Sequence, residues 1–469
     1  MDMKTVIMAG GCGTRISEYT KHLLGKELPK PMLPIDGTPL LVREICSLRD
    51  QGFKDIILTV SYLADEIINY LGDGSKLGVK IAYFVETQPL GNAGALFKIR
   101  DHLSDDFLLL NADSIFDIDF RRVVSFHREY EAMVTLFTHP NSHPYDSGLI
   151  ITDDNDKVMQ WLMKEESRPR YYTNRVNAGI HIINVKALNQ AAELMNIVID
   201  KIGTKNPYNG EIIKVDLDRQ ILKPLCSMGK VFAYDSPEYV KDMGTPERYE
   251  SVNRDYKAGI VHAKNLLHRQ KAIFLDRDGT INKYKGFLRD IDDFELIDGV
   301  SEAIKRINES GYLAIIVTNQ PVIARGELTL EELSLIHKKL ETLLGQNGAY
   351  VDSIYFCPHH TDRGFKGEIP ELKIDCDCRK PKPGMLLEAA RDFNIDLSSS
   401  WMVGDSRNDV MAGKNAGCKT CLLTGIGTRQ NGKGTNPDYG QELQCTSLLE
   451  FVDKVFKDKK VDETIRAKA

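Results

Sequence analysis

Residues 272–280 have the sequence AIFLDRDGT, and they constrain the fold more than any other stretch of this 469-residue chain. An apolar run of strand length that ends in two acidic residues predicts a buried strand of a parallel sheet, with Asp276 and Asp278 at its carboxyl end. Open α/β sheets bind their ligands at that edge. Residues 6–15, with the sequence VIMAGGCGTR, repeat the pattern of a strand followed by a turn. The sequence therefore predicts two active sites in one polypeptide.

The length and composition indicate two or three globular domains, because one core rarely serves more than about 250–300 residues. A hydrophobic content of 42% and a charged content of 27% are ordinary for globular proteins. The formal net charge of −6 and the lack of a long basic stripe argue against binding to nucleic acid or a membrane surface. No window approaches the ~18 apolar residues of a membrane span, and no signal-peptide segment opens the chain. We expect a cytoplasmic protein, and the sequence leaves open whether it forms a homo-oligomer.

Strands alternate with helices along the chain. In the first half, strand patterns occur at residues 55–60, 80–86, 106–110 and 177–184, with helical patterns between several of them. This alternation, which resumes after residue 271, predicts an α/β protein with two doubly wound, mostly parallel sheets. The expected division is a domain at residues 1–255, a charged helical junction at 256–270, a second domain at 271–455 and a solvated tail at 456–469.

The glycine-rich turn at residues 10–15 leaves several interpretations open. It lacks the Gly-Lys-Ser/Thr of a Walker loop, and the third glycine of a dinucleotide fingerprint would fall at Ile16. A turn with a purely structural role is the simplest alternative. Arg15 directly after the turn and Lys30 in a proline-stiffened segment favour a functional role. Backbone N–H groups and two fixed cations suit a triphosphate.

Five motifs in the first half resemble, in family order, those of the sugar-1-phosphate nucleotidylyltransferases. They are GGCGTR at 10–15 with PKPM at 29–32, PLGNAGA at 89–95, NAD at 111–113, NAG at 177–179 and DMGTP at 242–246. The similarity extends over about residues 3–255. It implies a Rossmann-like domain in which a sugar 1-phosphate attacks the α-phosphate of a nucleoside triphosphate and pyrophosphate leaves.

This resemblance implies roles for individual residues. Asp113 and Asp242 would hold Mg²⁺, which neutralises the growing charge. Arg15 would stabilise the leaving pyrophosphate and Lys30 the α-phosphate. The expected substrate-binding residues of this domain are Gly10, Gly11, Gly13, Thr14, Gly91, Asn92, Gly94, Lys164, Asn177 and Gly179.

The first half departs from the family pattern in the segment between Arg15 and Lys30, which lacks the usual Pro-Leu-Thr, and in two further places. Asn92 stands where the family usually has Thr or Ser, and Met163-Lys164-Glu165 replaces the usual Glu-Lys-Pro. The departure at Asn92 leaves the nucleotide base open. The departure at residues 163–165 allows a sugar other than glucose or mannose.

Four motifs in the second half resemble those of the haloacid dehalogenase superfamily of phosphatases. They are DRDG at 276–279, Thr318 at the end of an apolar strand, RKPKPG at 379–384 and GDS at 404–406. The resemblance implies that Asp276 is the nucleophile that forms an aspartyl-phosphate. Asp278 would protonate the leaving oxygen and then activate water.

The same resemblance supplies the binding groups of this second site. Thr318 and Lys380 would hold the phosphoryl oxygens, while Asp405 would hold Mg²⁺ together with Asp276 and a backbone carbonyl. The expected magnesium set is Asp276, Asp278 and Asp405, and the expected substrate contacts are Asn319, Arg325 and Arg379.

The nine cysteines are unevenly spread, and an odd number in a chain expected to be cytosolic does not indicate a disulfide framework. The segments CPH at 357–359 and CDC at 376–378 offer three thiolates and one imidazole, a set suited to structural Zn²⁺. Free core thiols are the alternative, and His360 is a rival ligand. The resemblance to the heptose bisphosphate and histidinol phosphatase branch favours the zinc ligands Cys357, His359, Cys376 and Cys378.

Together the two halves indicate a bifunctional enzyme of nucleotide-sugar synthesis for lipopolysaccharide or another surface glycan. Removal of the 7-phosphate from D-glycero-D-manno-heptose 1,7-bisphosphate leaves heptose 1-phosphate, which the first domain would activate with GMP from GTP or with AMP from ATP. GTP is the favoured donor. The alternatives are a mannose-1-phosphate guanylyltransferase fused to a histidinol-phosphate-type phosphatase, and a non-catalytic regulatory or scaffold protein.

Overall fold

The computed structural model describes residues 3–11, 14–429 and 437–456, and the chain divides into two compact units. Unit 1 comprises Met1–His139, Gly148–Lys164 and Arg175–Asn265. Unit 2 comprises Pro140–Ser147, Glu165–Asn174 and Leu266–Ala469. Two short segments from the first half of the sequence therefore belong to the same unit as the second half.

A nine-stranded mixed sheet forms the centre of unit 1, with the order β10-β9-β11-β6-β1-β4-β5, β8 beside β11, and β12 beside β8. Its strands are β1 (Lys4–Ala9), β4 (Asp55–Val60), β5 (Lys80–Val85), β6 (Asp106–Asn111), β8 (Val134–His139), β9 (Leu149–Thr152), β10 (Val158–Leu162), β11 (Val176–Asn184) and β12 (Val231–Asp235). Strands β5, β4, β1 and β6 run parallel, whereas β11 is antiparallel to β6. The expected α/β sheet is confirmed, with an antiparallel part that begins at β11.

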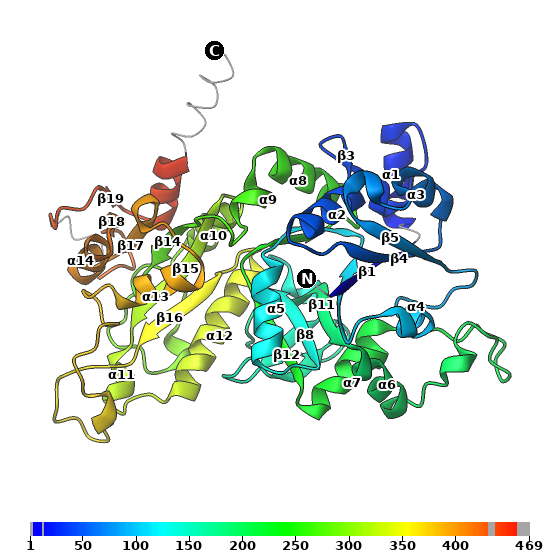
Figure 1. Ribbon diagram of the computed structural model, residues 1–469. Coiled ribbons are helices and arrows are strands. Elements are labelled where there is room, and N and C mark those ends of the chain that lie inside the picture. Colours follow the sequence, from blue (N-terminus) through cyan, green and yellow to red (C-terminus); the bar gives the residue numbers. More distant parts are fainter. Residues whose placement is uncertain (1–2, 12–13, 430–436, 457–469) are drawn as a thin grey trace, which may run out of the picture. The chain divides into compact units, whose positions relative to one another are not determined.

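Helices cover both faces of this sheet, as Figure 1 shows. Those on one face are α2 (Leu40–Asp50), α3 (Ala64–Leu71) and α5 (Phe120–Glu129), and those on the other are α4 (Gly94–Ile99), α6 (Val185–Leu194) and α7 (Lys223–Leu225). In α2, Leu41, Ile45 and Leu48 recur at helical spacing and are fully buried. Burial of such apolar stripes stabilises the layered packing.

Short elements form a second small core in unit 1. They are α1 (Thr14–Leu24), the hairpin of β2 (Pro34–Ile35) and β3 (Thr38–Pro39), and the antiparallel pair of β7 (Ser114–Asp117) and β13 (Tyr239–Asp242). Helix α8 (Pro246–Lys257) packs Tyr249 and Val252 against Ile16 of α1 and Leu33. This core brings the segment around Lys30 and strand β13 into one cluster.

The junction is less helical than expected. Helix α8 is followed by the short α9 (Ile260–Ala263), and residues 264–270 are not helical. Gly259 separates the two helices with φ of +73°, a left-handed conformation that glycine adopts readily and that ends a helix. Residues 457–469 of the expected tail lie outside the described residues.

Unit 2 contains a six-stranded parallel sheet with the order β16-β15-β14-β17-β18-β19. Its strands are β14 (Lys271–Leu275), β15 (Tyr312–Asn319), β16 (Ser353–Cys357), β17 (Trp401–Gly404), β18 (Lys419–Leu423) and β19 (Leu443–Cys445). Strand β14 lies in the middle, where Leu275 is in register with Ile316 of β15 and Val403 of β17. The second doubly wound domain is thus also present.

Helices again cover both faces of the unit 2 sheet (Figure 1). α10 (Val300–Asn308) and α12 (Leu330–Gln346) pack on one face together with residues 448–456, which are helical; α13 (Gly384–Asp392) and α14 (Arg407–Ala416) pack on the other. The short α11 (Pro321–Ala324) follows β15. The expected capping box at the start of α12 is present, since Thr329 and Glu332 exchange hydrogen bonds.

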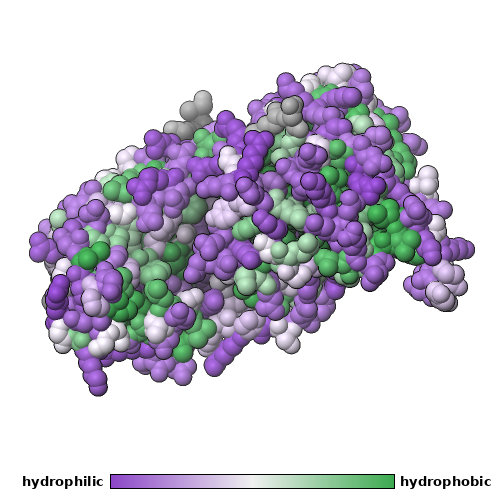
Figure 2. All heavy atoms as spheres, turned by 60° about the horizontal axis from the view of Figure 1, so that its bottom comes forward, coloured by the Kyte–Doolittle hydropathy of each residue, from purple (hydrophilic) through white to green (hydrophobic). Residues whose placement is uncertain are grey.

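Hydrophilic side chains predominate on the face drawn in Figure 2, and apolar side chains form scattered patches. Within the described ranges, no helix is both long and apolar enough to cross a membrane.

Candidate active sites

Three neighbouring strands of unit 2 bring the expected phosphatase residues to one sheet edge. Asp276 follows β14, Thr318 lies near the end of β15, and Asp405 follows β17. All three side chains are buried. The carboxyl ends of adjacent parallel strands meet, so residues separated by more than a hundred positions form one cluster.

Lys380 reaches the centre of this cluster. Its Nζ donates hydrogen bonds to Asp276 Oδ1 at 2.7 Å, to the Val317 carbonyl at 2.7 Å and to Asp409 Oδ1 at 2.6 Å. Asn319 fixes the backbone of Lys380, because its amide donates to the Lys380 carbonyl and accepts from the Lys380 N–H. The expected lysine is therefore held by three acceptors, and Asn319 acts on the loop that carries it.

Asp409 is a member of the cluster that sequence reasoning left out of the site. It lies in the first turn of α14 after Asp405, and this position one helical turn past the GDS motif was the available signal. The three carboxylates of Asp276, Asp405 and Asp409 offer oxygen atoms within 4.8 Å of one another. Such a concentration of buried acid suits a divalent cation with oxygen ligands.

Burial is the main influence on protonation in this cluster. It raises the pKa of Asp276 to about 6 and that of Asp405 to about 8, and the neighbouring carboxylates add to both shifts. Burial alone would lower the pKa of Lys380, but Asp276 and Asp409 outweigh it and raise that pKa. The lysine therefore stays charged beside carboxyl groups that resist ionisation without a further cation.

Two further features fit a bound cation at Asp405. Its Oδ1 atom is buried and makes no hydrogen bond within the described part of the chain, although Arg429 Nε lies 3.5 Å away. At Gly279, a Cβ atom would lie 1.9 Å from Asp405 Oδ2, and φ there is +89°. Only glycine allows the backbone to approach the carboxylate this closely.

Asp278 has different partners. Both of its carboxylate oxygens accept hydrogen bonds from Arg277 Nη2, at 3.0 Å for Oδ1 and 2.9 Å for Oδ2. The carboxylate also accepts hydrogen bonds from Asn282 and Gln320. Burial would raise the pKa of Asp278, but Arg277 and the hydrogen-bond donors outweigh it and lower that pKa. Gln320 also donates to Thr318 Oγ1, so the expected general acid and the expected phosphate-binding hydroxyl share one partner.

Arg277 is a second residue that sequence reasoning missed. Its side chain is fully buried although it stands between two acids in the sequence. Its Nη1 lies 3.3 Å from Nε2 of His337 on α12. Burial and Arg277 lower the pKa of His337 to about 3, so the neutral ring accepts from the guanidinium.

Two of the expected substrate contacts of unit 2, Arg325 and Arg379, pair with residues outside the carboxylate cluster. Arg325 is buried, with its guanidinium 4.2 Å from the Phe287 ring centre and 4.5 Å from that of Phe365. Its Nη2 lies 3.5 Å from His360 Nε2. Arg379 donates to the His359 carbonyl at 3.0 Å.

The cysteine and histidine cluster is compact. Cys376 Sγ lies 3.4 Å from Cys357 Sγ and 3.2 Å from Cys378 Sγ, and His359 Nδ1 lies 3.3 Å from Cys378 Sγ. A tetrahedral ion with Zn–S bonds of about 2.3 Å and Zn–N bonds of about 2.0–2.1 Å separates its ligand atoms by about 3.5–3.8 Å. The cluster therefore fits zinc after opening by a few tenths of an ångström, whereas His360 points to Arg325.

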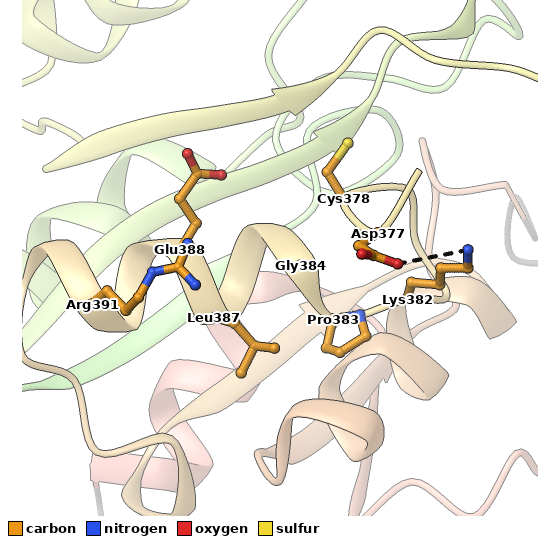
Figure 3. Close-up of a pocket in the computed structure, with 8 residues that line it drawn as sticks. All are labelled: Asp377, Cys378, Lys382, Pro383, Gly384, Leu387, Glu388 and Arg391. Atoms are coloured by element: carbon orange, nitrogen blue, oxygen red, sulfur yellow. Dashed lines mark ion pairs between the residues drawn. The ribbon is translucent and has the colours of Figure 1, made fainter. Parts of the chain in front are cut away.

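A pocket lies at the start of α13, next to this cluster (Figure 3). Its lining residues are Asp377, Cys378, Lys382, Pro383, Gly384, Leu387, Glu388 and Arg391. Lys382 Nζ lies 3.9 Å from Asp377 Oδ1, the ion pair drawn as a dashed line. Only Cys378 belongs to both the pocket and the expected site residues.

In unit 1, a short strand pair brings the two expected magnesium ligands together. Asp242 ends β13 and is in register with Ser114, the residue after Asp113, and the Met243 N–H donates to the Asp113 carbonyl at 3.0 Å. Asp242 accepts from Arg248 at 2.6 Å and from the Gly244 N–H at 2.8 Å. Burial would raise the pKa of Asp242, but these donors lower it, so the carboxylate is ionised.

Lys30 forms an ion pair with Asp113, one of these two carboxylates. It is buried at the start of a short 3₁₀ turn, and its Nζ lies 2.9 Å from Asp113 Oδ2. Behind it, Glu44 of α2 is buried, and neither carboxylate oxygen has a hydrogen-bond partner within the described residues. Burial, with a contribution from Asp113, raises the pKa of Glu44 well above its usual range. Glu44 occupies a position in an apolar stripe, so sequence reasoning did not single it out.

The glycine-rich turn is described only in part. Gly13 lies outside the described residues, and the backbone of Thr14 begins α1. Gly10 faces Ser61 and Glu86, where an added Cβ would meet them at 3.4 and 3.5 Å. At Gly11, no atom of the described residues would lie within 4 Å of an added Cβ. Arg15 and Asp242 both approach Gly244. A Cβ built on that glycine would lie 3.1 Å from Arg15 Nη2 and 2.8 Å from Asp242 Oδ1, so the two side chains are close to each other.

The expected base-binding loop at residues 89–95 is braced against residues 215–217. At Gly91, φ is +82° and an added Cβ would lie 2.3 Å from the Val215 carbonyl oxygen. Asn92 Oδ1 accepts a hydrogen bond from the Leu217 N–H at 2.8 Å. Gly94 begins α4 and leaves no room for a side chain beside Leu90. Asn92 therefore also has a structural role.

The expected sugar-binding residues flank a bulge. Asn177 Oδ1 accepts from the Gly179 N–H and lies 3.0 Å from His181 Nε2, within an irregular register between β11 and β8. Gly179 has φ of +75°, and a Cβ there would lie 2.5 Å from Asn111 Nδ2. Lys164 lies exposed, two residues after β10.

The sequence pattern of the nucleotidyl transferase family matches residues 4–259, and that of the HAD-hydrolase-like family matches residues 377–450. A D-glycero-beta-D-manno-heptose-1,7-bisphosphate 7-phosphatase of Pasteurella multocida is 46% identical over 166 residues, which cover 35% of this chain and 88% of that protein. The protein of the same name from Haemophilus ducreyi is 40% identical over 187 residues, covering 40% of this chain and 98% of its own.

Among solved structures, that of HddC from Yersinia pseudotuberculosis covers 54% of this chain and 99% of its own, with 24% identity and a TM-score of 0.42. The nucleotidyl transferase match covers the cluster around Asp113 and Asp242, and the HAD-like match covers Lys380, Asp405 and Asp409 of the second cluster. The chain therefore belongs to the nucleotidyl transferase family and, through its second half, to the HAD-like phosphatases, and it is a bifunctional enzyme.

Proposed function

We propose that the chain catalyses two consecutive steps of nucleotide-sugar synthesis. The second half removes the 7-phosphate from D-glycero-D-manno-heptose 1,7-bisphosphate, and the first half joins the resulting heptose 1-phosphate to a nucleotide. The observation that carries this proposal is the pairing of the two families in one chain. The phosphatase relatives are named for a reaction whose product keeps its 1-phosphate, and a sugar 1-phosphate is what a sugar nucleotidylyltransferase consumes.

In the phosphatase step, an Asp276 carboxylate oxygen attacks the phosphorus of the 7-phosphate, and the bond from phosphorus to the sugar oxygen breaks. Asp278 acts as general acid only in its protonated form, a small fraction because, despite burial, Arg277 lowers its pKa; that form donates its proton to this oxygen. The carboxylate then takes a proton from the water that releases inorganic phosphate. Lys380 and Thr318 hold the phosphoryl oxygens. Asp276, Asp405 and a backbone carbonyl would hold Mg²⁺, which would supply countercharge for the transferring group.

In the transferase step, a phosphate oxygen of the sugar 1-phosphate attacks the α-phosphorus of the triphosphate. The bond from that phosphorus to the oxygen bridging the α- and β-phosphates breaks, and pyrophosphate leaves with this oxygen. Lys30 neutralises the α-phosphate and Arg15 the leaving group. Asp113 and Asp242 would hold Mg²⁺, which would supply further positive charge there. The loop at residues 89–95 orients the base, and the bulged start of β11 at residues 177–179 orients the sugar.

GTP is the proposed donor, with ATP as the alternative. The support is that the first half resembles the guanylyltransferases of the GDP-heptose route, although Asn92 departs from the family pattern in the expected base-binding loop. The decisive assay supplies heptose 1,7-bisphosphate, as each anomer, with each of the four nucleoside triphosphates and follows phosphate and pyrophosphate separately. Phosphate with no pyrophosphate from any triphosphate, even when heptose 1-phosphate is added, would contradict the transferase half. Pyrophosphate with no phosphate would contradict the other half.

We also propose that Cys357, His359, Cys376 and Cys378 bind one structural zinc ion. Replacing Cys376 with Ser removes one ligand and should lower the zinc content from about one equivalent towards zero. It should also lower the free energy of unfolding by about 2 kcal/mol or more, because metal binding contributes directly to folding. Metal analysis and thermal unfolding measure both effects. Cys418→Ser, at a buried cysteine outside the cluster, is the matched control, and equal zinc in both variants would contradict the site.

The magnesium requirement of the phosphatase should weaken as the pH rises. Burial raises the pKa of Asp276 to about 6 and of Asp405 to about 8, so below these values protons compete with the metal for both carboxylates. Between about pH 6 and pH 8, the Mg²⁺ concentration for half-maximal phosphate release should fall at least about tenfold. Calorimetric titration of Mg²⁺ without substrate removes the contribution of substrate phosphate groups. A half-saturation value independent of pH would contradict the assignment.

A further inference from the structure

Helix α12 carries buried polar residues on the face opposite to its core stripe. Leu333, Ile336, Leu340 and Leu344 pack into the core of unit 2. Glu341, Thr342 and Gly345 lie on the other side of the helix and are nevertheless buried. Buried polar groups require partners. The partners here come from the two segments of unit 2, residues 140–147 and 165–174, that are contributed by the first half of the sequence.

Residues 165–174 bind to α12 through their backbone. The Tyr172 N–H donates to Thr342 Oγ1 at 2.9 Å, and the Asn174 N–H donates to Glu341 Oε2, also at 2.9 Å. Asn174 is 1% exposed, so its contact is shielded from water. Hydrogen bonds to a buried carboxylate are among the stronger ones in proteins. These two bonds fix the end of a ten-residue segment that contains no helix or strand.

Residues 140–147 hold the same segment from its other side. The Asn174 amide donates to the Asn141 carbonyl at 2.7 Å, and the Arg168 guanidinium donates to the Pro144 carbonyl at 2.6 Å and to that of Ser147. Pro144 packs directly on α12, because a Cβ at Gly345 would lie 2.9 Å from Pro144 Cγ. The small glycine therefore makes room for this segment.

The segment at 165–174 joins residues of the proposed sugar site. Lys164 immediately precedes it, and Asn177 and Gly179 follow it within five residues. We propose that α12 of the phosphatase domain positions the sugar-binding residues of the transferase, with Glu341, Thr342 and Gly345 as positioning residues. The inference rests on the proposed function of Lys164 and Asn177 in binding the sugar 1-phosphate.

The physical reason is entropic. A loop without internal structure that must be ordered when the sugar 1-phosphate binds weakens that binding by the entropy it loses. Contacts that order the loop beforehand remove this cost. The effect falls on sugar binding, because the residues that act on the triphosphate lie far from residues 165–174 in the sequence. These residues are Lys30, Asp113 and Asp242.

The test uses two variants of the full chain. Gly345→Ala puts a methyl group against the rigid Pro144 ring, yet favours the helix itself because alanine is the better helix former. Thr342→Val keeps the side-chain shape and removes the acceptor of the Tyr172 N–H. Each should raise KM for the sugar 1-phosphate about tenfold. KM for the triphosphate, kcat of the transferase and both constants of the phosphatase should stay within about twofold. Ser334→Ala, at an exposed position on the same side of α12, is the matched control and should change nothing.

Hydrogen exchange at the Tyr172 and Asn174 amides shows whether the anchor has opened, and both variants should lose protection there. Lost protection with an unchanged KM would overturn the inference, since the anchor would then be structural only. A raised KM accompanied by a loss of phosphatase activity would overturn it as well, since α12 itself would have been disrupted. A wild-type chain that forms no pyrophosphate would instead overturn the proposed function, and this inference with it.

Discussion

Replacing Asp276 with Asn should reduce phosphate release from heptose 1,7-bisphosphate by about 10³-fold or more, the loss typical when a catalytic nucleophile is removed. Asn has the same shape but cannot form the acyl phosphate. Lys380 keeps its contacts to Asp409 and to the Val317 carbonyl, so the loop that carries it should stay in place. The measurement is the initial rate of phosphate release at saturating Mg²⁺, compared with the wild type.

The same variant should leave stability and the other active site intact. Because burial raises the folded-state pKa of Asp276, its ionised form opposes folding at neutral pH, and this cost grows as the pH rises from the unfolded-state value through the folded one. Asp276→Asn should therefore unfold at no lower a temperature than the wild type at pH about 7.5. Pyrophosphate release with heptose 1-phosphate supplied directly should be unchanged. Phosphate release within about tenfold of the wild-type rate would contradict the assigned nucleophile.

Replacing Asp113 with Asn should reduce pyrophosphate release by about 10²–10³-fold, because the change removes one of two carboxylates that hold the countercharge for the triphosphate. It also frees Lys30 from its ion pair at 2.9 Å. The loss should be partly recovered at higher Mg²⁺ concentration, which distinguishes weakened metal binding from a misfolded site. The measurement is the rate of pyrophosphate release as a function of Mg²⁺.

Asp101→Asn provides the matched control for that change, since the Asp101 side chain is 86% exposed and lies outside the cluster. It should retain the wild-type rate. Phosphate release by the Asp113 variant should also be unchanged. If Asp113→Asn lowered both activities together, the carboxylate would be a structural group rather than a ligand of the transferase.

The sequence predicts the parts of these sites that depend on strand ends. Asp276, Thr318 and Asp405 each follow or end an apolar run, and parallel pairing then forces them together. The contact of Lys380 with Asp276 is harder to infer, because 104 residues separate the two and a loop carries the lysine. Its recognition depended on the family motif rather than on periodicity.

Other residues could not be predicted from local pattern. Arg277 is charged and follows a strand, which favours exposure, yet its bidentate pairing with Asp278 allows complete burial. Glu44 falls in an apolar helical stripe, where a carboxyl group has no sequence signature of its own. The binding of residues 165–174 to α12 joins positions 170 apart, and nothing in either segment alone indicates the other.

The pairing of Tyr172 with Thr342 has a consequence for synthesis on the ribosome. At about 5–20 residues per second, translation reaches Thr342 roughly 10–30 s after Tyr172. During that interval α12 has not been synthesised, so residues 140–147 and 165–174 of the nascent chain lack the helix to which they bind. The transferase domain would therefore emerge from the ribosome with these segments unfolded, and they would fold only after the second half of the chain has been made.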